Sequence, residues 1–152
     1  VWGHGFDLTT TAIITSLDGG HTRYISTVIK LNDTTIVSGS FDNTLVVWDL
    51  TDMNNVTTTP RAVLNGHTDY VRSVIKLNET TIVSASSDET LRIWDLTDMN
   101  NVTSRVLEGH TSCVVQVMKI NDTMIVSGSD DTTLRVWALT DTFIVSSRVI
   151  CV

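Results

Sequence analysis

The sequence contains only two cysteines, Cys113 and Cys151, and no Cys-x-x-Cys pair. This scarcity argues against a cysteine-based metal site and against a disulfide-rich scaffold. Basic residues are also few, since 10 lysines and arginines stand against 17 aspartates and glutamates, a formal net charge of −7. Nucleic acids and anionic membrane surfaces both attract basic faces, so neither is an expected partner.

Long apolar runs are missing as well. No stretch approaches the roughly 18 residues that a membrane-spanning helix needs. The first residues, VWGHGFDLTTT, lack the basic and apolar regions of a signal peptide, so the cytoplasm is the expected compartment. A glycosylated, secreted surface is the alternative, because five Asn-x-Thr sequons occur, at Asn32, Asn55, Asn78, Asn101 and Asn121.

One stretch of the sequence occurs three times. The copies are IVSGSFDNTLVVWD at 36–49, IVSASSDETLRIWD at 82–95 and IVSGSDDTTLRVWA at 125–138. Each copy follows a Gly-His dipeptide, and the histidine and the tryptophan move together, by 46 and then by 43 residues. A period of this length with Gly-His and Trp-Asp landmarks is typical of a four-stranded propeller blade.

The repeat divides the chain into the end of a partial blade (1–19) and three full blades (20–64, 65–107 and 108–152). No amphipathic helix pattern occurs, so we predict an all-β protein. The predicted strands are 24–31 (buried), 35–40, 44–49 and 61–64; 71–77, 80–86, 90–95 and 105–107; 114–120, 124–129, 133–137 and 143–150. A further strand at 12–17 would need a sheet that this chain does not supply.

Four polar residue types keep fixed positions in the repeat. The three sets are His21, Ser38, Asp42 and Trp48; His67, Ser84, Asp88 and Trp94; His110, Ser127, Asp131 and Trp137. A tryptophan N–H can donate to the serine hydroxyl, which can donate to an imidazole whose second N–H reaches the aspartate. We predict that each set forms a buried hydrogen-bond network that stabilises its blade.

Serine, histidine and aspartate together also suggest a hydrolase, but three copies are more than catalysis needs. The serine would lie within a strand, away from a sharp nucleophile turn or an oxyanion hole. The three histidines belong to different blades and His4 lies outside the sets, so we predict no metal site and expect no cofactor.

With these residues in register, positions 20–150 resemble the WD40-repeat family. The third copy departs from the family pattern, since Ala138 follows Trp137 where aspartate is usual. The resemblance implies a β-propeller of four-stranded antiparallel blades that serves as a non-enzymatic scaffold for protein or peptide partners. In such propellers partners often dock beside the turns that here carry Tyr24, Phe41, Tyr70, Ser87, Cys113 and Asp130.

The number of blades departs most from the family, because propellers close with about 4–8 blades. Three blades alone would expose two sheet faces, and such surfaces favour association. The chain is either a piece of a longer propeller or a homo-oligomer whose copies complete a propeller or stack. A structural, self-assembling repeat protein is therefore the alternative to an interaction scaffold.

Overall fold

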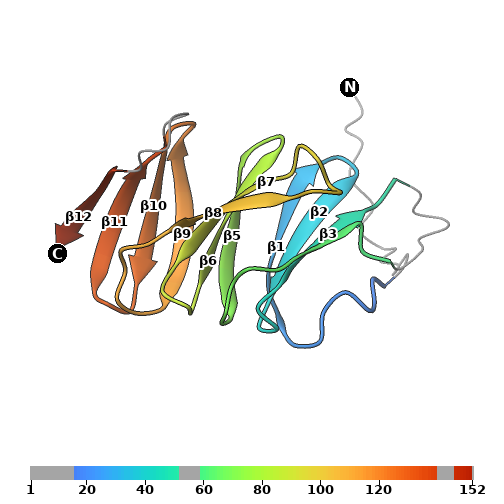
Figure 1. The fold of residues 1–152 in the computed structure, drawn as a ribbon, viewed down its shortest axis with the longest axis horizontal. Coiled ribbons are helices and arrows are strands. Elements are labelled where there is room, and N and C mark those ends of the chain that lie inside the picture. Colours follow the sequence, from blue (N-terminus) through green and yellow to red (C-terminus); the bar gives the residue numbers. More distant parts are fainter. Residues whose placement is uncertain (1–15, 52–58, 140–145, 152) are drawn as a thin grey trace, which may run out of the picture.

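The computed structural model describes residues 16–51, 59–139 and 146–151, and all regular elements within these ranges are β-strands (Figure 1). The first sheet consists of β1 (Ile25–Asn32), β2 (Thr35–Ser40), β3 (Leu45–Asp49) and β4 (Ala62–Leu64). The second consists of β5 (Val71–Asn78), β6 (Thr81–Ser86), β7 (Leu91–Asp95) and β8 (Thr103–Leu107). The third consists of β9 (Val114–Asn121), β10 (Met124–Ser129), β11 (Thr133–Ala138) and β12 (Ser146–Cys151).

Within each sheet the strands pair antiparallel in chain order, so each sheet is one blade. The blades stand in a row, with β5 packed beside β1 and β9 beside β5 (Figure 1). The predicted all-β fold of four-stranded blades is confirmed. The predicted strand at 12–17 lies mostly outside the described residues, and its described part, Ser16 and Leu17, is not in a strand. No helix among the described residues could cross a membrane.

Two kinds of turn define the register of each blade. The hairpin between the first two strands begins at Asn32, Asn78 or Asn121, whose side-chain oxygen accepts a hydrogen bond from the backbone N–H two residues later. This is an Asx turn, which explains why asparagine recurs there. The turn between the second and third strands places Asn43, Glu89 or Thr132 in the left-handed region, with φ of 74°, 71° and 70°.

The hydrophobic core lies between the blades, because each sheet is apolar on the faces that meet a neighbour. One cluster joins the first blade to the second through residues such as Leu45 and Val71. The other joins the second to the third through residues such as Leu91 and Val114. The second blade is therefore covered on both faces, whereas the first and third each have one face that no blade of the described structure covers.

The first strand of the first blade corrects one sequence prediction. Residues 24–31 were expected to form a buried strand, but Ile25 and Val28 are exposed and only Leu31 is fully buried. Their counterparts in the second blade, Val71 and Val74, are buried. The difference follows from tertiary packing, because no described element covers that face of β1.

Gly39 allows the first two blades to approach closely. A Cβ atom there would lie 2.7 Å from Cγ1 of Val71 and 2.9 Å from Cγ2 of Thr27. We expect Gly39→Ala to lower the free energy of unfolding by about 1–3 kcal/mol, since overpacking displaces neighbours. Denaturant unfolding measures the change.

Gly128 provides the matched control, because it occupies the same repeat position on the uncovered side of the third blade. The nearest contact of an added Cβ there is Cδ2 of Leu134 at 3.4 Å, an ordinary van der Waals distance. Under dilute conditions, in which the chain is a single molecule, Gly128→Ala should change stability by less than about 0.5 kcal/mol. Equal losses from the two substitutions would contradict the packing argument.

Candidate interaction site

The structure brings the four predicted polar residues together in each blade. The tryptophan Nε1–H donates to the serine Oγ over 2.8 Å in Trp48–Ser38, Trp94–Ser84 and Trp137–Ser127. The histidine Nε2 lies 2.7–2.8 Å from the same Oγ in all three blades. The serine hydroxyl thus accepts from the indole and donates to the imidazole, as the donor and acceptor inventory requires.

The second imidazole nitrogen completes the network. Nδ1 lies 3.0 Å from Asp42 in the first blade and 2.7 Å from Asp88 and Asp131 in the others. The network also contains a residue that the sequence argument missed, a threonine two positions after the aspartate. Its hydroxyl donates to the other carboxylate oxygen over 2.6–2.7 Å in Thr44, Thr90 and Thr133. The Asp-x-Thr pattern, present in all three copies, is the signal that could have found it.

These hydrogen bonds control the ionisation of the aspartates. Burial raises the pKa of Asp42, but the hydrogen bonds from Thr44, Thr22 and His21 outweigh burial and lower the pKa to about 2. The pKa values of Asp88 and Asp131 are also lowered, since hydrogen bonds from the histidine and the threonines again exceed the opposing effect of burial. The carboxylates are therefore ionised acceptors at neutral pH.

The glycine before each histidine lies against the tryptophan ring. A Cβ atom on Gly20 would lie 2.3 Å from Cη2 of Trp48, and one on Gly66 would lie 3.0 Å from Cη2 of Trp94. A side chain on Gly20 would displace the indole of Trp48, and one on Gly66 would first meet the guanidinium of Arg92, at 2.8 Å. In the Gly-His dipeptide, the glycine thus lets the backbone lie close to the indole, and the histidine supplies the imidazole of the network.

The network is closed to substrates. The His67 side chain is fully buried, and Ser84 and Trp94 are buried beside it. Ser84 Oγ is already engaged by both the indole and the imidazole. Among the described residues, no group of three His, Cys, Asp or Glu side chains could hold a metal ion. The arrangement suits structural support of the turns above it.

Aromatic side chains from two blades form a cluster at the end of the strands where the network histidines and aspartates lie. Phe41 and Tyr70 stack with ring centroids 4.5 Å apart and planes inclined by 6°. Tyr24 meets Phe41 edge-on at 6.4 Å and is largely exposed to solvent. We call Tyr24, Phe41 and Tyr70 the aromatic rim. Tyr24 is exposed and the other two rings are half-buried, and aromatic residues of this kind commonly anchor protein interfaces.

Arg72 extends the aromatic rim with a positive charge. Its guanidinium carbon lies 5.0 Å from the Phe41 ring centroid and 5.7 Å from that of Tyr70. The register of β5 shifts between Val71 and Ser73, so Arg72 occupies a β-bulge. Bulges redirect side chains, which explains how Arg72, a strand residue, contacts the rings of Phe41 and Tyr70 in the neighbouring turns. Sequence reasoning missed this residue, because a bulge leaves no clear sequence pattern.

The six predicted partner-binding residues form one continuous row across the blades. Backbone N–H to carbonyl bonds link them within each blade: Phe41 to Tyr24, Ser87 to Tyr70 and Asp130 to Cys113. Between blades, Phe41 stacks on Tyr70, and the Cys113 thiol lies 3.7 Å from the Ser87 carbonyl oxygen. The row is aromatic from Tyr24 through Phe41 to Tyr70 and non-aromatic from Ser87 through Cys113 to Asp130.

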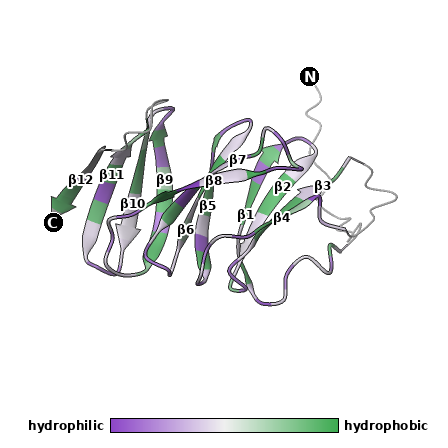
Figure 2. Ribbon diagram, viewed as in Figure 1, coloured by the Kyte–Doolittle hydropathy of each residue, from purple (hydrophilic) through white to green (hydrophobic). Residues whose placement is uncertain are grey.

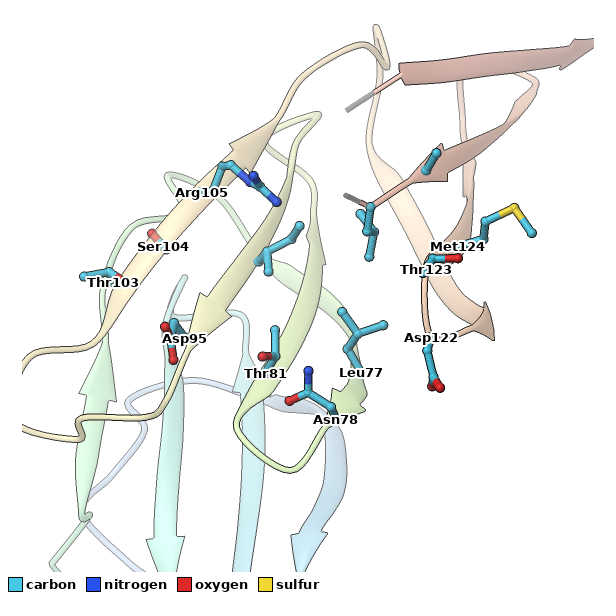
Figure 3. A pocket seen from close by; sticks show the side chains of 13 residues that line it. Leu77, Asn78, Thr81, Asp95, Thr103, Ser104, Arg105, Asp122, Thr123 and Met124 are labelled. Carbon is cyan, nitrogen blue, oxygen red and sulfur yellow. The ribbon is translucent and has the colours of Figure 1, made fainter. Parts of the chain in front are cut away.

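Two hollows flank the blades at opposite ends of the strands. One, of 730 Å³, lies at the aromatic rim and is lined by His21, Thr22 and Arg23 beside the three aromatic rings. The other, of 960 Å³, opens between β8 and the turn before β10 (Figure 3). Its lining includes Arg105 and Asp122 but no aromatic side chain. The aromatic rim is therefore the better candidate for binding a partner.

Comparison with known protein families gives three matches along the chain. The model of the WD domain, G-beta repeat, matches residues 10–49, 58–95 and 101–138, together more than half of the chain. The second match includes β4, which pairs with β3 in the first blade, so sequence repeats and blades are offset by one strand. No curated protein matches the chain significantly.

Proposed function

Because the chain belongs to the WD40 family, whose repeats serve in general as protein-interaction scaffolds, we propose that its aromatic rim binds a peptide segment of a protein partner. The observation that carries this proposal is the stack of Phe41 on Tyr70 with Arg72 above it. These rings come from different blades and are held in place before any partner arrives. Preorganised aromatic anchors lose little conformational entropy on binding.

The chemistry of the rim indicates the kind of peptide. The rings offer apolar surface, and the guanidinium groups of Arg72 and Arg23 offer donors for carbonyl or carboxylate oxygens. We expect a segment with one apolar or aromatic side chain beside an acceptor group. Such a side chain would fill the hollow lined by Tyr24, Phe41 and Tyr70.

The proposed scaffold acts without catalysis. The repeated Ser-His-Asp sets have their serines bonded to indole N–H groups, and the second and third histidines are buried. A nucleophilic serine must reach its substrate, with donors placed for the developing oxyanion. Neither condition fits a side chain such as that of Ser84, which lies inside a blade.

Phe41→Ala tests the proposed site. Peptides selected from a random phage-displayed library on the immobilised chain serve as the probe, and their affinities are measured by isothermal titration calorimetry. We expect Phe41→Ala to weaken binding by about 2 kcal/mol, or roughly 30-fold, because it removes both a ring and the support of Tyr70.

Val63→Ala is the matched control, since Val63 is an exposed apolar residue on β4 that is not part of the rim. It should leave the affinity unchanged. Circular dichroism verifies that both variants are folded. Selected peptides that bind the wild type and the Phe41→Ala variant equally well would place the binding surface elsewhere.

A second function, self-assembly, is favoured by a different observation. The third blade exposes Leu134 and Ile150 on one sheet face. The first blade exposes Ile25 and Val28 on the β1 side of its outer face. Large apolar faces mark association sites. A structural protein whose copies complete a propeller would cover both faces.

A further inference from the structure

We propose that the uncovered face of the third blade binds the uncovered face of the first blade in a second copy of the chain. This contact would repeat the junction that the chain already forms twice, between the first and second blades and between the second and third. The inference deepens the proposed self-assembly and is independent of peptide binding at the aromatic rim.

The two internal junctions have the same composition. In each, the preceding blade contributes leucines from its first, third and fourth strands: Leu31, Leu45 and Leu64 in one junction, and Leu77, Leu91 and Leu107 in the other. The following blade contributes two valines of its first strand and the tryptophan of its network: Val71, Val74 and Trp94, and then Val114, Val117 and Trp137. Three leucines of one blade therefore meet two valines and a tryptophan of the next blade each time.

The third blade presents the same leucine-type face, and no described blade covers it. Leu134 pairs with Ile150 across β11 and β12, just as Leu91 pairs with Leu107 across β7 and β8. Leu134 is 40% exposed and Ile150 48%, whereas Leu91 and Leu107 are buried. The exposed pair occupies the positions that the next blade covers elsewhere in the chain.

The first blade presents the complementary face. Ile25 and Val28 stand at the repeat positions of Val71 and Val74, and they are 54% and 58% exposed while those valines are buried. Figure 2 shows hydrophobic residues on the strands of both end blades. One chain thus exposes part of each half of a junction on its two outer faces. On the first blade the exposed part is the β1 side, since Val46 and Trp48, which share the face of Val28, are buried.

A lysine contact supports the same pairing. At each internal junction a lysine of the following blade donates to a main-chain carbonyl of the preceding blade: Lys76 to Leu31 and Lys119 to Leu77, both over 2.6 Å. The corresponding lysine of the first blade is Lys30, whose described contact is an ion pair with Asp33. The corresponding carbonyl of the third blade is that of Ile120. The proposed contact would bring Lys30 of one copy to Ile120 of the next.

The row of rim residues also has matching ends. Each internal junction joins the residue before the network aspartate to the residue three positions after the next histidine, as in Phe41 with Tyr70. Asp130 and Tyr24 are left as the two ends of this series, without a neighbouring blade among the described residues. A second copy packed as proposed would place Tyr24 beside Asp130.

Head-to-tail contacts close into a ring or continue as an open array. The described residues of two copies provide six blades, which lies within the range of about 4–8 at which propellers close. A closed pair would cover both hydrophobic faces of both copies. Analytical ultracentrifugation of the chain should therefore give a mass of at least twice 16.7 kDa. A single-chain mass at all concentrations up to about 1 mM would overturn the proposal.

Two neighbouring residues on β12 allow a matched comparison. Val149 is 45% exposed, nearly as much as Ile150, but its counterparts Val63 and Val106 remain exposed at 46% and 37% beside the internal junctions. Ile150→Asp should weaken association by about 100-fold or more, since it would bury a charge. Val149→Asp should leave association unchanged. An equal response of the two variants would contradict the assigned face while leaving self-assembly itself intact.

Mixing two variants tests the polarity of the contact. Ile150→Asp disables only the third-blade face, and Val28→Asp disables only the first-blade face. Each alone should be a single chain, and an equimolar mixture should form pairs through the one intact junction. Restored pairing would also prove that both variants are folded. Association of either variant alone, or a mixture that stays unpaired, would overturn head-to-tail packing.

Discussion

Ser84→Ala is expected to lower the free energy of unfolding by about 3 kcal/mol. The Ser84 hydroxyl accepts from the indole of Trp94 and contacts Nε2 of His67. Both partners are buried, so neither can replace the lost bond with water. An unsatisfied buried polar group costs about 1–3 kcal/mol, and this substitution creates two.

Ser87→Ala is the control for this prediction. Ser87 is also buried, but its hydroxyl is bonded to Nε of Arg72, an exposed residue that can turn to water. Ser87→Ala should therefore lower the free energy of unfolding by less than about 0.5 kcal/mol. Urea unfolding followed by tryptophan fluorescence measures both variants.

The same Ser84→Ala variant decides between a structural and a catalytic role for the Ser-His-Asp set. Hydrolysis of p-nitrophenyl acetate is measured for the wild type and for Ser84→Ala. We expect no turnover above the uncatalysed rate in either. Turnover by the wild type that disappears in a variant of unchanged stability would revive the hydrolase interpretation.

Acidification is expected to destabilise the blades, beginning below about pH 4 and continuing below pH 2. The three network aspartates have folded-state pKa values below the ordinary value of 3.8, and that of Asp42 is about 2. A group with a depressed folded pKa adds stability above its unfolded pKa, and this stability is lost as the pH falls through the folded pKa. Each aspartate should contribute roughly 1–2 kcal/mol, so all three together should contribute several.

Asp88→Asn tests this assignment. The variant should be less stable than the wild type at pH 7 and should lose less stability on acidification, because one titrating group is gone. Asp33→Asn is the control, since Asp33 is an exposed aspartate whose pKa is lowered chiefly by its hydrogen bond to Lys30. Urea unfolding at several pH values provides the comparison. A profile for Asp88→Asn that parallels the wild type would contradict the argument.

Much of the fold could be predicted from the sequence because the repeat preserves local register. In every copy the aspartate lies four residues after the serine and six before the tryptophan, as Asp88 and Asp131 do. Spacing along two paired strands determines which side chains meet across them, so the networks follow from the spacing. The threonine of the Asp-x-Thr turn was accessible to the same reasoning.

The candidate site was less predictable. Spacing identified Phe41 and Tyr70 as rim residues, but their parallel stacking depends on how two blades pack against each other. The contact of Arg72 with the aromatic rim depends on a bulge in β5, and no residue pattern predicts that bulge. Contacts between blades arise from the angle and distance of whole sheets, which local sequence does not encode.

The sequence by itself determined the blade: its four strands, its Asx turns and the buried set that joins His67, Ser84, Asp88 and Trp94. These features depend on residues that are close in sequence or paired in a hairpin. Only the tertiary structure decided which faces are covered. Val28 and Val74 occupy the same repeat position, yet one is exposed and the other is buried. The reason is physical, because burial depends on the neighbouring sheet and not on the residue itself.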